Sequence, residues 1–126
     1  MAENFSSWHY SAPVIDLHAH SNMSDGLDSP TELVQNAALA GVTTLAITDH
    51  DTTLGWDEAI IAGRQNQVRV IPGIEVSTRQ LIGENRSISV HILAYLPDPK
   101  NSALVEELDK TRRSRIDRAK KMVALL

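Results

Sequence analysis

The alternation of apolar, β-branched runs with helical segments restricts the fold more than any other feature of this sequence. The segments follow the order β-α-β-α-β-β, with a further helix at the end. This order favours an α/β fold with a mainly parallel sheet. The expected strands are a segment beginning at Val14 and the ranges Val42–Thr48, Val68–Val76 and Ser87–Leu96, and the expected helices begin after Ser29, near Leu54 and at Ser102.

The first helix has local start and stop signals. Ser29 suits an N-cap, Pro30 suits the first helical position, and Glu32 completes a capping box. Gly41 suits the C-terminal end of the helix.

Two histidines stand at the end of the first expected strand. His18 and His20 lie two residues apart, so an extended chain points both imidazoles to one face. Asp25 follows in a polar loop, from which its carboxylate can turn back toward them. Borderline metal ions bind imidazole and carboxylate groups, so this stretch favours a metal site over separately solvated side chains.

Later strands deliver more polar groups to the same edge, because functional groups in parallel α/β folds gather at the carboxyl ends of the strands. Asp49 and His50 follow the second strand, and Glu75 lies near the end of the third. A turn centred on Gly83 would form a hairpin between the third and fourth strands and place His91 opposite Glu75. The alternative is that each group is an isolated loop residue.

Composition fits one globular domain or part of one. The chain has 126 residues, 42% hydrophobic content, a net charge of −4 and no cysteine, which excludes disulfides and thiolate zinc sites. No apolar run approaches the roughly 18 residues that a membrane span needs. Residues 1–12 are interpreted as a leader without a signal-peptide pattern, so we expect a cytoplasmic protein without membrane contact.

The donor set itself indicates a reaction. Several imidazoles and carboxylates without thiolate suit Mn²⁺, Zn²⁺ or Fe²⁺, and less well Mg²⁺. Their number exceeds the need of one ion, so we expect a cluster of two or three. Clustered ions bind phosphate oxygens and lower the pKa of bridging water. The predicted chemistry is hydrolysis of a phosphate ester by a metal-bound hydroxide, with amide hydrolysis as the nearest rival.

The polar segments resemble, in order, the motifs of the polymerase and histidinol phosphatase (PHP) family. The matching segments are Asp16-Leu-His-Ala-His-Ser21, Ser24-Asp25-Gly26, Thr48-Asp49-His50-Asp51, Pro72-Gly73-Ile74-Glu75 and Val90-His91-Ile92-Leu93. They are most similar to the branch that acts on nucleoside 3′,5′-bisphosphates and on short oligonucleotides from the 5′ end. The resemblance implies a distorted (β/α)7 barrel with three metal ions.

The resemblance also implies a role for each residue. The expected ligands are, for the first ion, His18, His20 and Glu75; for the second, Glu75 and His91; and for the third, Asp25 and His50. Many family members have histidine at the position of Asp25. Asp49 is the candidate catalytic residue, and it would act by orienting a ligand.

The last segment carries a basic run. Arg112 and Arg115 are candidates for binding the substrate phosphate. The favoured alternative is a solvated helix face that pairs with nearby carboxylates. The family places further ligands late in the chain, and this sequence stops before them. We therefore expect residues 13–100 to be the N-terminal part of the barrel and 101–126 to begin a helical insertion, without the C-terminal part of the barrel.

Together these patterns predict a metal-dependent phosphoesterase. Its expected substrate is a phosphate monoester or diester of a nucleotide, either a 3′,5′-bisphosphate or a short oligonucleotide. The alternatives are a phosphatase of a small metabolite similar to histidinol phosphate, the proofreading module of a polymerase, and a truncated module that binds metal without catalysis. Activity is expected of the full-length protein rather than of these 126 residues alone.

Overall fold

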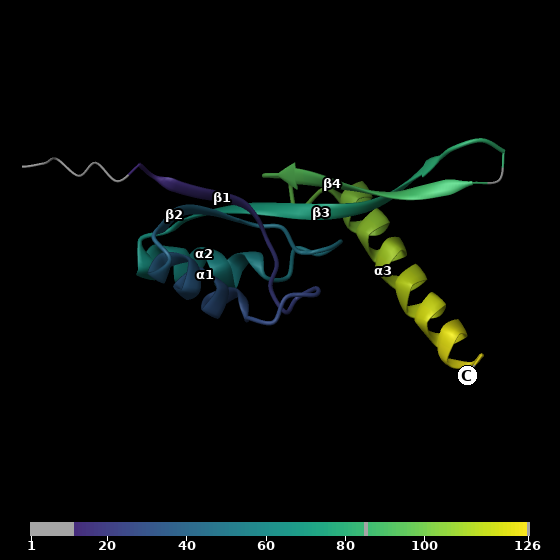
Figure 1. The fold of residues 1–126 in the computed structure, drawn as a ribbon, viewed down its shortest axis with the longest axis horizontal. Coiled ribbons are helices and arrows are strands. Elements are labelled where there is room, and N and C mark those ends of the chain that lie inside the picture. Colours follow the sequence, from purple (N-terminus) through teal and green to yellow (C-terminus); the bar gives the residue numbers. More distant parts are fainter. Residues whose placement is uncertain (1–11, 85, 126) are drawn as a thin grey trace, which may run out of the picture.

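The computed structural model describes residues 12–84 and 86–125, so nearly all of the expected leader, residues 1–12, lies outside the described residues. The predicted α/β order is confirmed (Figure 1). In chain order the elements are β1 (Val14–Ala19), α1 (Pro30–Leu39), β2 (Val42–Ile47), α2 (Trp56–Asn66), β3 (Arg69–Leu81), β4 (Ser87–Tyr95) and α3 (Ser102–Val123).

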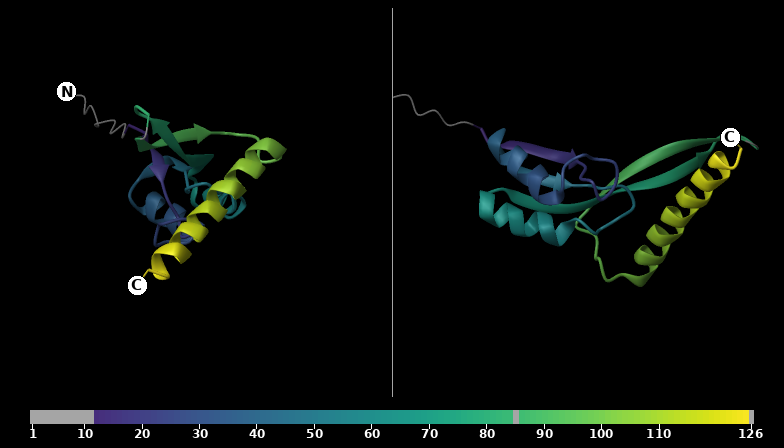
Figure 2. Two further views of the ribbon diagram at one scale, coloured as in Figure 1. Left: turned by 90° about the vertical axis from the view of Figure 1, so that its right-hand side faces the viewer. Right: turned by 90° about the horizontal axis from the view of Figure 1, so that it is seen from below.

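The four strands form one sheet in the order β1-β2-β3-β4. β1, β2 and β3 are parallel, and β4 is antiparallel to β3, as the sequence predicts. Helices α1 and α2 lie side by side against one face of the sheet, as Figures 1 and 2 show. The parallel arrangement brings the carboxyl ends of β1, β2 and β3 to the same edge.

β3 and β4 differ from the expectation in length and register. β3 continues through Pro72 and extends to Leu81, so the two strands form a long ribbon that projects beyond the rest of the sheet (Figure 1). His91 pairs with Ser77 and not with Glu75, so the centre of the turn is one residue later than Gly83. The partner of His91 therefore moves by two residues, which is one period of a strand, and the face is unchanged.

The ends of the helices follow their local signals. The Ser29 side chain accepts a hydrogen bond from the Glu32 amide, and the Glu32 carboxylate accepts one from the Ser29 amide at 2.9 Å, which completes the predicted capping box. Gly41 has a φ of 81°, the left-handed conformation expected just after a helix. The Asn101 side chain caps α3 by accepting from the amide of Leu104.

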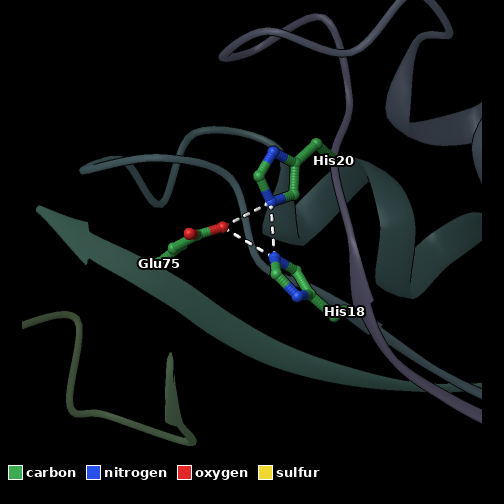
Figure 3. A group of neighbouring side chains, drawn as sticks. All are labelled: His18, His20 and Glu75. Carbon is green, nitrogen blue, oxygen red and sulfur yellow. Dashed lines mark hydrogen bonds and ion pairs between the residues drawn. The ribbon is translucent and has the colours of Figure 1, made fainter. Parts of the chain in front are cut away.

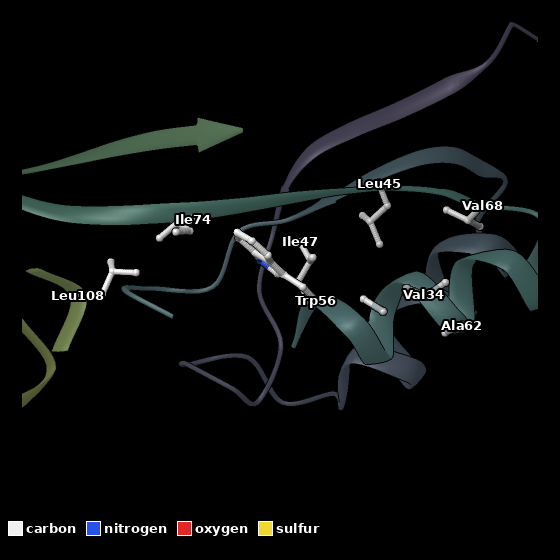
Figure 4. Packing of buried hydrophobic residues seen from close by; sticks show 9 residues of the cluster. Val34, Leu45, Ile47, Trp56, Ala62, Val68, Ile74 and Leu108 are labelled. Carbon is white, nitrogen blue, oxygen red and sulfur yellow. The ribbon is translucent and has the colours of Figure 1, made fainter. Parts of the chain in front are cut away.

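The hydrophobic core lies between the sheet and the helices (Figure 4). Leu45 and Ile47 of β2 are almost fully buried, and Trp56 donates its indole N–H to the Gly73 carbonyl at 2.9 Å. Leu108 of α3 belongs to the same cluster and is the one buried residue of that helix among the described residues. Burial of such a side chain contributes about 2 kcal/mol, so Leu108 anchors the first half of α3. None of the described helices combines the length and apolar character needed to cross a membrane.

Candidate metal centre

Three side chains converge on one point, as Figure 3 shows: His18 of β1, His20 just after it, and Glu75 of β3. Glu75 Oε2 lies 2.7 Å from His18 Nε2 and 2.8 Å from His20 Nε2. The two Nε2 atoms are 3.1 Å apart. These separations are close to the roughly 3.3 Å expected between ligand atoms that surround a tetrahedral Zn²⁺ at about 2.0 Å. The geometry therefore fits a single divalent ion held by all three groups.

A second group forms in the loop that follows β1. Asp25 Oδ1 is 2.6 Å from His20 Nδ1, and Asp25 Oδ2 is 3.5 Å from His50 Nε2. His20 thus directs one ring nitrogen to each group. With Nδ1–H donated to Asp25, the lone pair of His20 lies on Nε2 and faces Glu75. A carboxylate that accepts the second N–H of an imidazole in this way fixes its tautomer and orientation.

A third group joins β4 to the same edge. His91 Nδ1 is 2.7 Å from Glu75 Oε1, and His50 Nε2 is 3.8 Å from Glu75 Oε2. The candidate ligand atoms of each of the three groups lie within 4.8 Å of one another. The ribbon register explains how His91 arrives, because it is the diagonal neighbour of Glu75 on the same face.

The carboxylates of the centre are held in their ionised form. Burial raises the pKa of Glu75, but the hydrogen bonds from His18 and His91 outweigh it and lower that pKa to about 2. The hydrogen bond with His20 lowers the pKa of Asp25. Both groups therefore carry negative charge at neutral pH, as metal ligands must.

His50 packs among the other imidazoles of the centre. Its imidazole packs edge-on against those of His20 and His91, with ring centroids 4.7 and 4.9 Å away. Its Nδ1 atom is buried and accepts or donates no hydrogen bond among residues 12–84 and 86–125. The ring nitrogen that faces Asp25 and Glu75 is the other one, Nε2. A set of imidazole and carboxylate donors such as this fits a divalent ion.

The six predicted ligands thus all lie at one edge of the sheet. They fall into three overlapping groups: His18, His20 and Glu75; His20, Asp25 and His50; and His50, Glu75 and His91. The family resemblance implied that Glu75 would be shared between two ions. It did not indicate that His20 and His50 would each stand between two groups, because that depends on how the loops fold back.

The carboxylate of Asp49 accepts hydrogen bonds from the loop between His20 and Asp25 and, among residues 12–84 and 86–125, makes none with a histidine. It is 1% exposed, and it accepts hydrogen bonds from the Ser21 amide at 2.8 Å and the Ser21 hydroxyl at 2.7 Å. The Ser24 hydroxyl donates to it at 2.6 Å. Ser21 and Ser24 were not predicted as functional residues, although their place beside the histidine motif was a usable signal.

Arg115 reaches the centre through a carboxylate. Its Nη2 lies 2.9 Å from Asp51 Oδ2, and it also contacts the Ser77 hydroxyl. Asp51 in turn accepts a hydrogen bond from the Ser77 amide at 2.8 Å. Nothing in the sequence marked this pair, because 64 positions separate Asp51 from Arg115. Arg112 pairs with Asp109 at 3.5 Å, as a solvated helix face would.

A cavity of about 1010 Å³ opens from the centre and runs between α3 and the β3–β4 ribbon. Asp25, His50 and His91 line it at the centre. Arg112 and Arg115 line it from α3, so both candidate phosphate-binding residues face the same space as three of the candidate ligands.

Comparison with known families agrees with this arrangement. The model of the PHP domain matches residues 16–119 of this chain. The chain belongs to the PHP domain family. Two curated relatives of this PHP domain are named as enzymes that act on RNA or on a nucleotide. A 5′-3′ exoribonuclease of Haemophilus influenzae is 45% identical over 79% of the chain, and a 3′,5′-nucleoside bisphosphate phosphatase of Chromobacterium violaceum is 40% identical over 89%.

Two solved structures share the fold of this PHP domain. A protein of Bifidobacterium adolescentis, proposed to be a metal-dependent phosphoesterase, superposes with a TM-score of 0.80, at 38% identity over 90% of the chain. An amidohydrolase from Chromobacterium violaceum, with bound sulfate, gives 0.76 at 40% identity over 87%. The chain spans only 36% to 38% of the length of these four proteins.

Proposed function

We propose that this PHP domain is part of a metal-dependent phosphoesterase that hydrolyses a nucleotide phosphate, either a 3′,5′-bisphosphate or a short oligonucleotide. The observation that carries the proposal is the meeting of six imidazole and carboxylate side chains in three overlapping groups. The printed activities of two relatives, a bisphosphate phosphatase and an exoribonuclease, support the substrate class.

We assign the metal ligands according to the three groups of neighbouring side chains. His18, His20 and Glu75 hold one divalent ion, Glu75 and His91 share a second, and Asp25 and His50 hold a third; Mn²⁺, Zn²⁺ and Fe²⁺ suit this donor set. When bound, such ions lower the pKa of water and neutralise phosphate oxygens. Glu75 needs no proton removed before it binds, because its pKa is about 2.

The remaining polar residues orient these ligands and the substrate. Asp49 holds the loop that carries His20 and Asp25 in place, so it is a positioning residue. Arg112 lines the cavity and offers a guanidinium to the phosphate, since its pairing with Asp109 is exposed and weak. Arg115 can bind the phosphate only if its ion pair with Asp51 breaks. It is therefore the weaker of the two candidates for phosphate binding.

The test is hydrolysis by the purified protein after chelation and after return of Mn²⁺ or Zn²⁺. We expect release of phosphate from a nucleoside 3′,5′-bisphosphate, or of nucleotides from a short RNA, only when metal is present. Glu75→Gln should lower kcat/KM about a thousandfold, because removal of a ligand charge costs several kcal/mol of transition-state stabilisation.

Asp57→Asn is the matched control, because Asp57 is an exposed carboxylate on α2 that belongs to none of the three groups and does not line the cavity. It should leave kcat/KM unchanged within a factor of two. Turnover that resists chelation, or a Glu75→Gln protein with activity within a few-fold of the parent, would show that the proposed function is wrong. Cleavage of amides with no cleavage of phosphate esters would favour the rival chemistry.

A further inference from the structure

The cavity beside the centre is larger than the reacting phosphate requires. Its volume of about 1010 Å³ lies at the upper end of the roughly 300–1,000 Å³ that whole small-molecule ligands occupy. The candidate ligands line only its inner end. Its other lining residues come from the β3–β4 ribbon and α3, which form two walls. Figure 2 shows how these elements are arranged.

The ribbon wall carries an arginine among hydroxyl groups. Arg79 and Ser89 pair across the ribbon and both line the cavity, as does Ser87. The pair of Arg79 and Ser89 lies two residues farther out than the pair of Ser77 and His91. Two residues of strand correspond to about 7 Å, so Arg79 marks a position beyond the centre along the groove.

The α3 wall carries a second arginine. Arg118 lies three residues after Arg115, so the two share one face of the helix, and both line the cavity. Arg115 is already paired with Asp51, and Lys110 is paired with Glu106 and Glu107.

Arg79 and Arg118 differ from these cations, because neither has an ion-pair partner among the described residues. Both are exposed. The chain as a whole has a net charge of −4, yet five of the cavity-lining residues are Lys or Arg and one is a carboxylate. Arg79 and Arg118 line the same cavity from the ribbon and from α3, and the Ser89 hydroxyl lies on the ribbon opposite Arg79. Guanidinium and hydroxyl groups together suit a phosphate.

We propose that Arg79 and Arg118 form an outer anion subsite that binds a phosphodiester of an oligonucleotide, beyond the phosphate that lies at the centre. This inference rests on the proposed function and deepens it. A nucleoside 3′,5′-bisphosphate carries the same two neighbouring phosphates as one unit of an oligonucleotide, so the second phosphate of either substrate would reach this subsite, whereas an aryl phosphate with a single phosphate would occupy the inner end alone.

The test measures binding without turnover. A fluorescently labelled ribonucleotide hexamer is titrated with the protein in excess chelator, and anisotropy gives Kd. Arg79→Ala and Arg118→Ala should each raise Kd about tenfold, because each removes one charge-assisted contact. Each should also lower the slope of log Kd against log salt by about 0.7. The lysine variants of both positions should retain most of the affinity, since they keep the charge.

Arg64→Ala is the control, because Arg64 is an exposed arginine near the end of α2 and makes the same change of net charge. It should change Kd by less than about twofold. Kinetics add a second comparison: the KM of the hexamer and of a nucleoside 3′,5′-bisphosphate should rise in the two alanine variants, while the KM of an aryl phosphate, which has one phosphate, stays the same.

Binding of the hexamer by Arg79→Ala and Arg118→Ala as tightly as by the parent would overturn the subsite, and so would an equal loss in Arg64→Ala. The experiments test the subsite and the proposed function independently. Loss of binding in the two variants of a protein that never hydrolyses phosphate esters would keep the subsite and reject the activity.

Discussion

At the scale of single residues, the centre depends on Glu75, whose two carboxylate oxygens face imidazoles on opposite sides. Oε2 faces His18 and His20, and Oε1 faces His91. The candidate residues could be predicted because each lies on a strand or in the loop after one, and spacing along a strand is local information. The link between Arg115 and Asp51 could not, because it joins distant segments and depends on where α3 docks.

Asp49 gives a prediction at this scale. Asp49→Ala should lower the free energy of unfolding by about 3 kcal/mol, because it leaves the buried Ser21 amide and hydroxyl without an acceptor. It should also weaken metal binding by about 10- to 100-fold, since the loop of His20 and Asp25 loses its support. Denaturant unfolding and calorimetric titration with Mn²⁺ measure the two effects.

Asp49→Asn distinguishes support of the loop from simple loss of packing. It keeps one acceptor oxygen and an amide that can donate to the Ser21 hydroxyl, so both losses should be smaller than in the alanine variant. If the Asp49→Ala variant bound metal as tightly as the parent protein, Asp49 would not be a positioning residue.

At the scale of elements, the predictions hold where the signal lies inside one segment. The capping box of Ser29 and Glu32 and the start of α3 at Ser102 formed as the sequence indicates. The register of β3 against β4 did not, because Gly83 is not the centre of the turn. The error kept His91 on the correct face, since a shift of two residues preserves the alternation of a strand.

The loop after β1 gives a prediction for an element. A Cβ added at Gly26 would overlap the carbonyl group of His20, which is backbone and cannot move aside without shifting the loop. Gly26→Ala should therefore cost about 1–3 kcal/mol of stability and also weaken metal binding, because His20 and Asp25 move with the loop. Thermal unfolding and metal titration report the two effects.

Gly41→Ala is the matched control. Its φ of 81° strains any L side chain, but nothing lies within 4 Å of an added Cβ. It should cost about 1 kcal/mol of stability and leave metal affinity unchanged. If both variants reduced metal affinity alike, the effect at Gly26 would be one of general stability and not of the loop.

At the scale of the whole molecule, the described chain joins a compact unit of sheet and two helices to a projecting ribbon and α3 (Figure 1). Leu108 and Arg115 attach α3 to that unit, one by burial and one through Asp51. Helical periodicity predicted α3 but not its direction, because only these long-range contacts determine where the groove forms. That the segment 101–126 begins a helical insertion remains a prediction.

The most direct test of the account is anomalous X-ray diffraction from crystals of the protein grown with Mn²⁺. The account predicts anomalous peaks within about 2–2.5 Å of the candidate ligand atoms, the first of them shared by His18, His20 and Glu75. Crystals of Glu75→Gln should lose that peak. A map of the parent protein at saturating Mn²⁺ without a peak near these atoms would contradict the central claim that these side chains form a metal centre.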